Sequence, residues 1–387
     1  MRVVVVLVSA LAVALLGAPT ASAAPPAAHP GYTIVAPQLT PLVAGGKPTR
    51  VLTGVLDAAG YAVEVPAHWN GQLVMWAHGF RGNGAELTVD APSYGLRQRF
   101  VDQGYAWAAS SYDRNGYDVA SGVRSTHELA TAQALAAVRA YPPGPDYGTV
   151  ALPAIYAGLG LAPNNPAVTT PKAQQLRAET VLDSGGVRPG ADASFSYWKD
   201  FLLSLAVPGN APTPVTGVAL NPGVVATNVG HDYAPDAPVN PDVTVQRVRP
   251  ADPAARNSRA LTPVAQVAGK PRVPVLTLHG VGDLFVPFSM EQIYAGEVAD
   301  AGRSDLLVQR AIRTTGHCEF SDAEAGKAWD DLVAWTDGGK RPAGDDVDAT
   351  SGPTFGCRFS DPAAYAAAGP PSQTDTRRLF APCPATG

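Results

Sequence analysis

The sequence predicts an α/β fold with a mostly parallel central sheet. Apolar runs rich in β-branched residues, which suit buried strands, alternate along the chain with segments whose apolar residues recur at helical spacing. The clearest case is residues 273–320, where a strand, an acidic turn, a helix, a second strand and a histidine-bearing loop follow in order. Strands that alternate with helices favour a parallel sheet covered on both faces.

The composition indicates a globular protein and excludes some partners. The chain has 387 residues, 46% of them hydrophobic, which is enough to bury a large core. Charged residues make up only 16%, and the net charge is −5 with no cluster of Lys or Arg. Without a basic patch, neither nucleic acid nor an anionic membrane is an expected partner.

Residues 1–23 have the pattern of a secretory signal peptide. Arg2 gives the positive start, residues 3–16 form an apolar run, and Ala21-Ser22-Ala23 is a small-residue cleavage site. The apolar run is too short to span a bilayer. We therefore expect a secreted protein that is not held at a membrane once the signal is removed.

Residues 24–148 are predicted to form the first half of the α/β core. The predicted elements are, in order, strands at 49–56, 61–65 and 72–78, a helix that ends at Gly104, a strand at 105–112 and a helix from Ser125 to Tyr141. The last helix begins with a capping box, in which the side chains of Ser125 and Glu128 pair with backbone N–H groups.

Residues 149–262 are predicted to be an insertion of helices and loops, which either caps the pocket and shapes substrate choice or packs on the core without contacting the substrate. Helical patterns cover residues 174–181 and 195–205, and residues 215–220 form a short strand-like run. Residues 232–259 are rich in Pro and Asp and are expected to form a surface loop. His231 lies just before that loop and has no second residue at metal-binding spacing, so no metal site is predicted.

Residues 263–347 are predicted to form the second half of the core. A strand at 273–279 is expected to be buried on both faces, and Asp283 follows its end. A short buried strand at 306–309 leads to the loop that carries His317. An acid after one strand and a histidine after the next is the order found in the second half of a hydrolase triad.

Two further capping boxes are predicted in this half. Ser289 with Gln292 would begin the helix after the acidic turn, and Gly302 would end it. Ser321 with Glu324 would begin the helix after the histidine loop.

Four motifs resemble the α/β-hydrolase family, in particular its exported bacterial esterases, amidases and peptidases. The motifs are HGFRGNG at 78–84, SSYDRNG at 110–116, GDLFVP at 282–287 and GHCEF at 316–320. The resemblance covers residues 49–141 and 263–347. It implies hydrolysis of an ester or amide bond in a small-molecule or peptide substrate, with no cofactor.

The resemblance also implies roles for particular residues. Asp283 would orient the imidazole of His317 and stabilise its charged form, and His317 would be the base of a Ser/His/Asp-type triad. The backbone N–H of Phe80, with Arg81 nearby, would donate a hydrogen bond to the developing oxyanion.

The nucleophile of such a triad is not recognisable. The family places it at a Gly-x-Ser-x-Gly elbow between a strand and a helix, and this sequence contains no such pattern. Ser184 follows a bulky leucine, and Ser110 and Ser111 are better placed to line the pocket. Cys318 adjoins the base on the backbone, which makes an in-line attack awkward. The elbow strand and its helix are therefore predicted to be deleted.

Three interpretations follow from the sequence. The protein is an exported hydrolase with an unrecognised nucleophile, a non-catalytic relic that keeps the pocket and binds a ligand, or a deletion product with an incompletely paired sheet. Without the nucleophile, a triad enzyme loses orders of magnitude in rate.

Residues 348–387 are predicted to be a cysteine-containing tail that folds back on the core. Cys357 and Cys383 both lie in it. A disulfide between them, which an oxidising environment would maintain, would stabilise the fold by roughly 3–4 kcal/mol. Cys318 would then be an unpaired thiol.

Overall fold

The computed structural model describes both predicted halves of the core and much of the insertion between them. The described residues are 27–35, 37–56, 58–79, 81–82, 84–116, 148–149, 152–204, 229–230, 268–372 and 375–384. The signal peptide, the helix from Ser125 to Tyr141, the strand at 215–220 and the loop at 232–259 lie outside the described residues.

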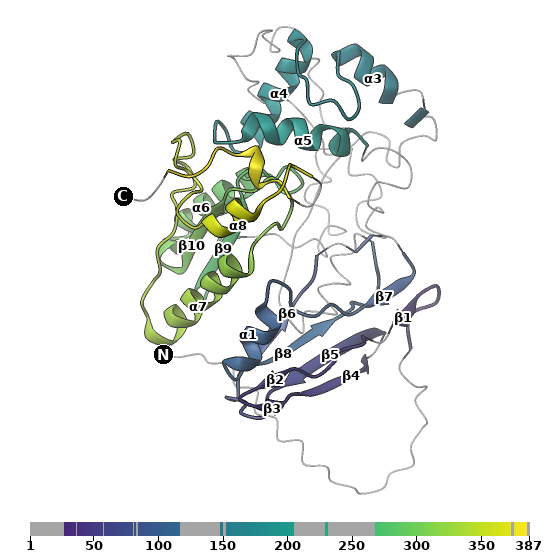
Figure 1. Cartoon of the computed structure of the whole chain (residues 1–387), viewed down its shortest axis with the longest axis vertical. Helices are drawn as coiled ribbons and strands as arrows, with labels where there is room; N and C mark the ends of the chain where they lie inside the picture. The colour runs from purple at the N-terminus through teal and green to yellow at the C-terminus, as the bar shows by residue number, and fades with distance from the viewer. Residues whose placement is uncertain are drawn as a thin grey trace, which may run out of the picture.

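The N-terminal half contains a four-stranded sheet with the order β4-β5-β8-β6 (Figure 1). Its strands lie where the sequence predicts them: β4 (Arg50–Leu56), β5 (Ala59–Val65), β6 (Leu73–Trp76) and β8 (Ala106–Ser110). β5 is antiparallel to both β4 and β8, whereas β6 is parallel to β8. Helix α1 (Leu96–Asp102) lies on the crossover that this parallel pair requires.

Two short strand pairs accompany this sheet. β1 (Thr33–Val35) is parallel to β7 (Glu86–Thr88), and β2 (Val43–Ala44) is antiparallel to β3 (Lys47–Pro48). Among the described residues, parallel and antiparallel strand pairs are therefore both present, and a mostly parallel central sheet stays a prediction.

A buried carboxylate lies at the centre of the N-terminal half. Glu64 on β5 is fully buried and accepts hydrogen bonds from Arg97 Nε at 2.8 Å, Trp107 Nε1 at 2.9 Å and Thr49 Oγ1 at 2.5 Å. Burial alone would raise the pKa of Glu64, but these donors outweigh it and hold the pKa below its usual range. The carboxylate is thus ionised and links strands, helix α1 and the N-terminal segment.

The C-terminal half is built on a strand–helix–strand unit. β9 (Val275–Gly280) and β10 (Leu307–Ile312) are parallel neighbours, joined through α6 (Ser289–Asp300) and the 3-10 helix η6 (Ser304–Leu306). β10 is buried along its whole length, but β9 is mostly half-buried, which corrects the prediction that it is buried on both faces. Among the described residues β9 pairs along one edge only, and its partial exposure is consistent with that.

The two described capping boxes have different outcomes. Helix α7 (Asp322–Gly338) begins as predicted, because Ser321 Oγ accepts from the Glu324 N–H and the Glu324 carboxylate accepts from the Ser321 N–H. The predicted box of Ser289 and Gln292 is wrong, because Phe288 is the N-cap of α6 and no side chain caps it. Gln292 instead donates to two backbone carbonyls of other segments, so tertiary contacts replace the local one.

Helices occupy the described part of the predicted insertion. They are α3 (Leu152–Leu159), α4 (Pro171–Asp183) and α5 (Ala191–Ser204), in the upper part of Figure 1. The carboxylate of Asp200 on α5 accepts from Tyr156 on α3 at 2.6 Å and from the buried ammonium of Lys199 at 2.8 Å. Residues 152–204, which are described throughout, contain no strand, as predicted.

The two halves of the core meet where α1 packs against α7. The ring of Trp329 on α7 lies 4.6 Å from that of Phe100 and 5.3 Å from that of Tyr105, measured between centroids. Arg99 on α1 and Asp330 on α7 form an ion pair at 2.8 Å beside these rings. Helix α7, which also packs against β9, is thereby held against the N-terminal half.

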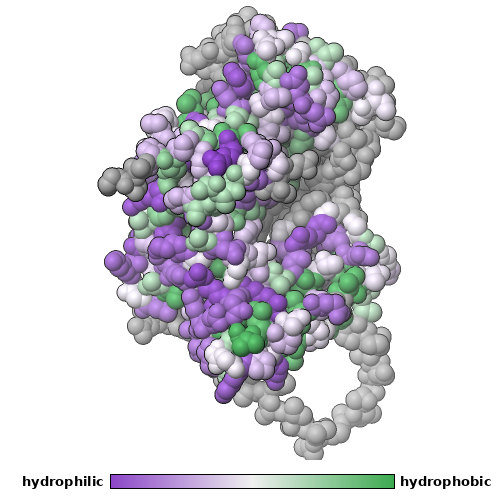
Figure 2. Space-filling model, in the orientation of Figure 1, coloured by the Kyte–Doolittle hydropathy of each residue, from purple (hydrophilic) through white to green (hydrophobic). Residues whose placement is uncertain are grey.

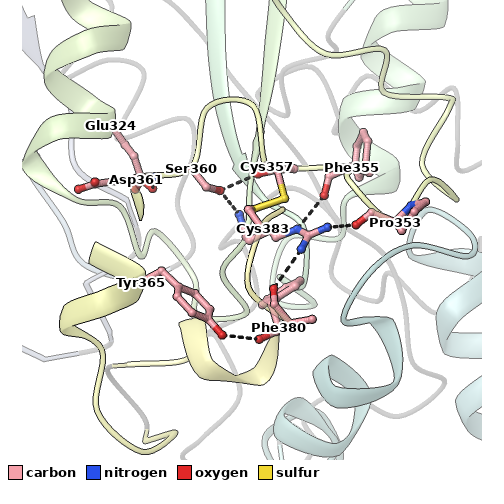
Figure 3. The surroundings of a disulfide bond; sticks show 12 residues. Glu324, Pro353, Phe355, Cys357, Ser360, Asp361, Tyr365, Phe380 and Cys383 are labelled. Carbon is pink, nitrogen blue, oxygen red and sulfur yellow. Dashed lines mark hydrogen bonds between the residues drawn. A yellow bond between two sulfur atoms is a disulfide. The ribbon is translucent and has the colours of Figure 1, made fainter. Parts of the chain in front are cut away.

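The C-terminal tail folds back on the core, as predicted, and contains the disulfide Cys357–Cys383 (Figure 3). Its helical turns are α8 (Pro362–Ala367) and η7 (Arg377–Leu379). The buried guanidinium of Arg313, on the loop after β10, donates to three tail carbonyls, those of Pro353, Phe355 and Ala381. One side chain of the core thus binds both segments that the disulfide joins.

On the face shown in Figure 2, hydrophilic residues gather over α1 and α7, and apolar residues form smaller patches scattered over the rest of the face. No helix within the described residues is both long enough and apolar enough to cross a membrane.

We expect the Cys357→Ser/Cys383→Ser double variant to lower the free energy of unfolding by roughly 3–4 kcal/mol, because the cross-link restricts the unfolded chain. Urea denaturation measures this change. The exposed thiol of Cys318 provides a matched control, since Cys318→Ser should change stability by less than about 0.5 kcal/mol. A double variant as stable as the wild type would contradict the expectation.

Candidate active site

Asp283 is fixed by the turn that follows β9. Its side chain is 5% exposed, and its Oδ1 accepts hydrogen bonds from the backbone N–H groups of Phe285 at 2.8 Å and Val286 at 3.2 Å. An aspartate that binds the N–H groups of the residues that follow it makes its own turn, so the local sequence is sufficient to set this geometry. Oδ2 is left to bind another partner.

That partner is His317, on the loop that follows β10. The distance from His317 Nδ1 to Asp283 Oδ2 is 2.6 Å. β9 and β10 are parallel and in register, with Ile312 opposite Gly280, so their carboxyl ends lie at the same edge of the sheet. The structure therefore brings together the two residues that the sequence singled out as acid and base.

The Asp283 contact makes the imidazole a strong base in the free protein. The pKa of His317 is raised from 6.5 to about 10, first by the hydrogen bond to Asp283 and then by the side chain of Cys318, while partial burial acts in the opposite direction. At neutral pH the ring is thus protonated. It becomes able to accept a proton as the pH approaches 10.

The geometry divides the two ring nitrogens of His317 between two tasks. Asp283 binds Nδ1 and thereby keeps a proton on that nitrogen, which leaves Nε2 for proton exchange. The side chain of His317 is 38% exposed, so the ring can reach a group outside the core. This arrangement suits general acid–base chemistry.

An aromatic cluster borders the histidine. The ring of Phe285 lies 4.8 Å from that of His317, edge to face, and contacts Phe201 at 5.5 Å and Trp198 at 6.3 Å between centroids. Phe285 comes from the turn of Asp283, whereas Phe201 and Trp198 come from α5 in the predicted insertion. Phe201 and Phe285 are 39% and 38% exposed, so the cluster presents an apolar wall beside the imidazole.

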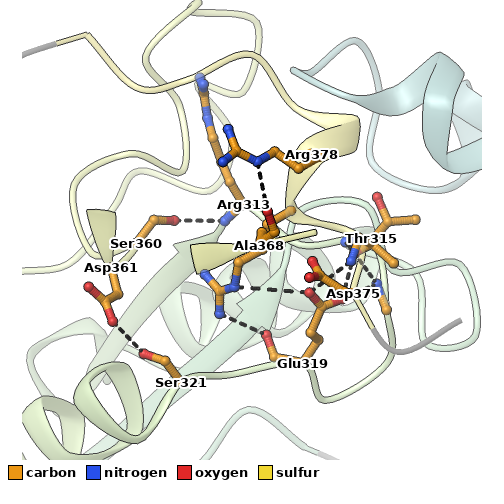
Figure 4. Close-up of polar contacts among 12 residues, drawn as sticks. Arg313, Thr315, Glu319, Ser321, Ser360, Asp361, Ala368, Asp375 and Arg378 are labelled. Atoms are coloured by element: carbon orange, nitrogen blue, oxygen red, sulfur yellow. Dashed lines mark hydrogen bonds and ion pairs between the residues drawn. The ribbon is translucent and has the colours of Figure 1, made fainter. Parts of the chain in front are cut away.

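The backbone of the histidine loop is held from two sides. On one side, Trp198 Nε1 donates to the carbonyl of Thr315 at 2.9 Å. On the other, the hydroxyl of Thr376 in the tail accepts from the N–H groups of Thr315 at 2.6 Å and Gly316 at 3.0 Å, in the region drawn in Figure 4. These contacts were not predicted, because nothing local in the sequence marks a tryptophan or a threonine as the partner of a distant loop.

The predicted oxyanion turn is described only in part. Phe80 lies outside the described residues. The guanidinium of Arg81 forms an ion pair with Asp90. The ring of His78 stacks on that of Tyr112 at 4.1 Å, and the Tyr112 hydroxyl donates to the His78 carbonyl at 2.6 Å. The role of Phe80 and Arg81 at an oxyanion stays a prediction.

Ser110 and Ser111 support the same region through backbone contacts. Ser110 Oγ accepts from the Tyr112 N–H at 3.1 Å, and Ser111 Oγ accepts from the Gly60 N–H at 2.9 Å and donates to the Tyr112 carbonyl. Both hydroxyls therefore brace the end of β8. That they also line a substrate pocket stays a prediction.

Within the described residues, no serine or threonine hydroxyl is hydrogen-bonded to His317. Ser184 ends α4, where its hydroxyl donates to the Val181 carbonyl and accepts from Arg188 at 2.9 Å. Cys318 is a free, exposed thiol next to His317, with a left-handed backbone at φ 55°. The Tyr94 hydroxyl holds this turn by donating to the Cys318 carbonyl at 2.7 Å.

No group of three His, Cys, Asp or Glu side chains in the described part of the chain could hold a metal ion. His231, at which no metal site is predicted, lies outside that part.

Comparison with known proteins relates part of this chain to an amidase. Over 82 residues it is 37% identical to an o-phthalyl amidase of Xanthobacter agilis. The matched stretch is 21% of this chain and 18% of the amidase, so the chain spans less than a fifth of the length of that relative. No family model matches the chain.

We expect Asp283→Asn to lower the pKa of His317 from about 10 toward 6.5, because an amide cannot stabilise the imidazolium as a carboxylate does. The titration of the His317 Cε1–H signal by proton NMR measures this change. Asp330→Asn removes a carboxylate that pairs with Arg99 on the α1–α7 contact and should leave the titration unchanged. An unaltered pKa in Asp283→Asn would refute the role given to this carboxylate.

The same pair makes stability depend on pH. Because the folded-state pKa of His317 is raised, its contribution is complete below 6.5 and is lost as the pH rises through about 10. For a partly exposed ion pair the contribution is on the order of 1 kcal/mol. The difference in unfolding free energy between wild type and Asp283→Asn should therefore shrink between pH 6 and pH 10.5 in urea titrations.

Proposed function

We propose that this protein is an exported member of the α/β-hydrolase family that hydrolyses an amide bond, with Asp283 and His317 as the acid and base of a Ser/His/Asp-type site. The observation that carries the proposal is the 2.6 Å contact between these side chains at the ends of two neighbouring parallel strands. The partial similarity to an amidase favours an amide over an ester as the bond that is broken.

In the proposed mechanism, Asp283 holds the proton on Nδ1 and Nε2 of His317 exchanges protons with the reacting groups. Nε2 first takes the proton of the attacking hydroxyl and then gives it to the leaving amine. Asp283 stabilises the imidazolium in between. The attacking hydroxyl is left unassigned, because no residue in the described ranges occupies that position.

We further propose that the acyl group of the substrate is a small aromatic acid. Phe285 and Phe201 present partly exposed rings next to His317, and aromatic rings bind other rings edge to face or with an offset. The relative named above is an amidase whose name specifies an o-phthalyl group, which is itself aromatic. A ring seated on this wall would place its amide carbonyl near the imidazole.

A ligand-binding protein without turnover is the second candidate. Within the described residues, His317 has no hydroxyl partner, and β6 and β9 each pair along one edge only. Both observations agree with a core that lacks the elbow strand. Such a protein would keep the aromatic wall and the acid–histidine pair as a binding site.

Turnover of an o-phthalyl amide, measured by the release of the amine, tests whether the protein is an amide hydrolase. We expect the wild type to hydrolyse it and to react with a fluorophosphonate probe, and His317→Ala to lose both by at least a thousandfold. His68→Ala, which removes an exposed imidazole bound to the Asp102 carbonyl, is the matched control and should keep both.

The rate constant kcat/KM should rise with pH toward about 10, as His317 loses its proton. Ligand binding without labelling or turnover, in a protein that melts cooperatively, would instead support the second candidate.

The aromatic wall makes a separate prediction about substrate choice. Phe201→Ala should raise KM for the aromatic amide roughly three- to tenfold, because a ring contact is worth about 0.5–1.5 kcal/mol. The same variant should leave KM for an acetyl amide unchanged. Leu182→Ala removes an exposed apolar side chain from the neighbouring helix α4 and serves as the control. Equal effects on both amides would show that Phe201 does not contact the acyl group.

A further inference from the structure

The hydroxyl of Thr376 is fully used in holding the histidine loop. It accepts hydrogen bonds from the N–H groups of Thr315 and Gly316 at 2.6 and 3.0 Å, and it donates to Glu319 Oε2 at 2.5 Å. A hydroxyl has one proton and two lone pairs, so these three contacts saturate it. Thr376 is also fully buried, which keeps water from replacing any of them.

The contacts of Thr376 surround His317 on the chain. Thr315 and Gly316 precede the histidine, and Glu319 follows it by two residues. Glu319 also accepts from the backbone N–H of Thr376 at 3.0 Å, so this one tail residue is bonded to both ends of the turn that carries the imidazole. The backbone before His317 and the side chain of Glu319 after it are therefore both bonded to one residue of the tail.

The tail is itself fixed beside this loop. The guanidinium of Arg377 forms two hydrogen bonds with the carboxylate of Glu324, at 2.8 and 2.7 Å, and both side chains are buried. The disulfide Cys357–Cys383 joins the two arms of the tail on either side of these residues. Thr376 is thus held in place by an ion pair on one side and by a covalent cross-link around it.

We propose that the C-terminal tail is the positioning element of the acid–histidine pair: Thr376 fixes the backbone on both sides of His317 so that the ring reaches Asp283, and the Cys357–Cys383 cross-link holds the tail that carries Thr376. Thr376 is a positioning residue, because it acts through the loop and not on a substrate. The importance of Thr376 for catalysis rests on the proposed function. The effect of Thr376 on the position of His317 can be measured without a substrate.

The test compares Thr376→Val with Thr376→Ser. Valine keeps the size and β-branching of threonine but removes the hydroxyl that binds two N–H groups and one carboxylate oxygen, whereas serine keeps it. Without that hydroxyl the Thr315 N–H loses its partner, and the Gly316 N–H keeps only its longer contact with Glu319 Oε2 at 3.3 Å. The control is Thr350→Val, since the Thr350 hydroxyl is likewise buried but donates to the Val187 carbonyl, outside the histidine loop.

Two readouts follow the loop directly. In Thr376→Val we expect the backbone amides of Thr315 and Gly316 to exchange with deuterium at least tenfold faster. We also expect the pKa of His317, measured by NMR titration, to fall by about 1 or more. Thr376→Ser and Thr350→Val should keep the wild-type values. Unchanged exchange and titration in a folded Thr376→Val would overturn the proposal, and so would serine behaving like valine.

A second variant keeps the test decisive if Thr376→Val does not melt cooperatively. The Cys357→Ser/Cys383→Ser variant leaves Thr376 intact but frees the arms of the tail, and the same two readouts should move in the same direction. No change there would overturn the proposal. If these readouts move as expected while the wild type hydrolyses no amide, the positioning role stands and the proposed function fails.

Discussion

Four hydrogen bonds from three segments meet at the buried carboxylate of Glu324. They come from the N–H of Ser321 at the start of α7, the N–H of Asp361 at the start of α8, and both terminal nitrogens of Arg377. Removing one partner of a buried ion pair of this kind typically costs about 3–5 kcal/mol, because the other charge is left unpaired. The same carboxylate therefore begins a helix of the core and attaches the tail, and the histidine loop lies between the two.

The site combines two kinds of constraint. The approximate positions of Asp283 and His317 follow from the sheet, because parallel neighbouring strands end at the same edge. Their final separation depends on loop contacts, from the backbone N–H groups that hold Asp283 to the hydroxyl of Thr376 behind His317. In such a site the sheet keeps the two residues at neighbouring strand ends, but substitutions far from the reacting atoms can change the distance between their side chains.

The parts that the sequence predicts are those determined by close neighbours. Ser321 and Glu324 of the capping box are three positions apart, and Asp283 and His317 each follow the end of an apolar run. Trp198 and Thr376 could not be found in this way, because they meet Thr315 from 117 and 61 positions away and belong to no local pattern. The Ser289 and Gln292 box failed for the same reason, since distant carbonyls take the glutamine side chain.

The contact between Thr315 and Thr376 also sets the order in which the site takes shape during biosynthesis. Asp283 and His317 are both made before the ribosome reaches Thr376, and isolated helices form within about a microsecond. Disulfides form over seconds to hours, so the arms that carry Thr376 close last. The acid and the histidine therefore come from the middle of the chain, whereas the contact that fixes the histidine loop comes from near its C-terminal end.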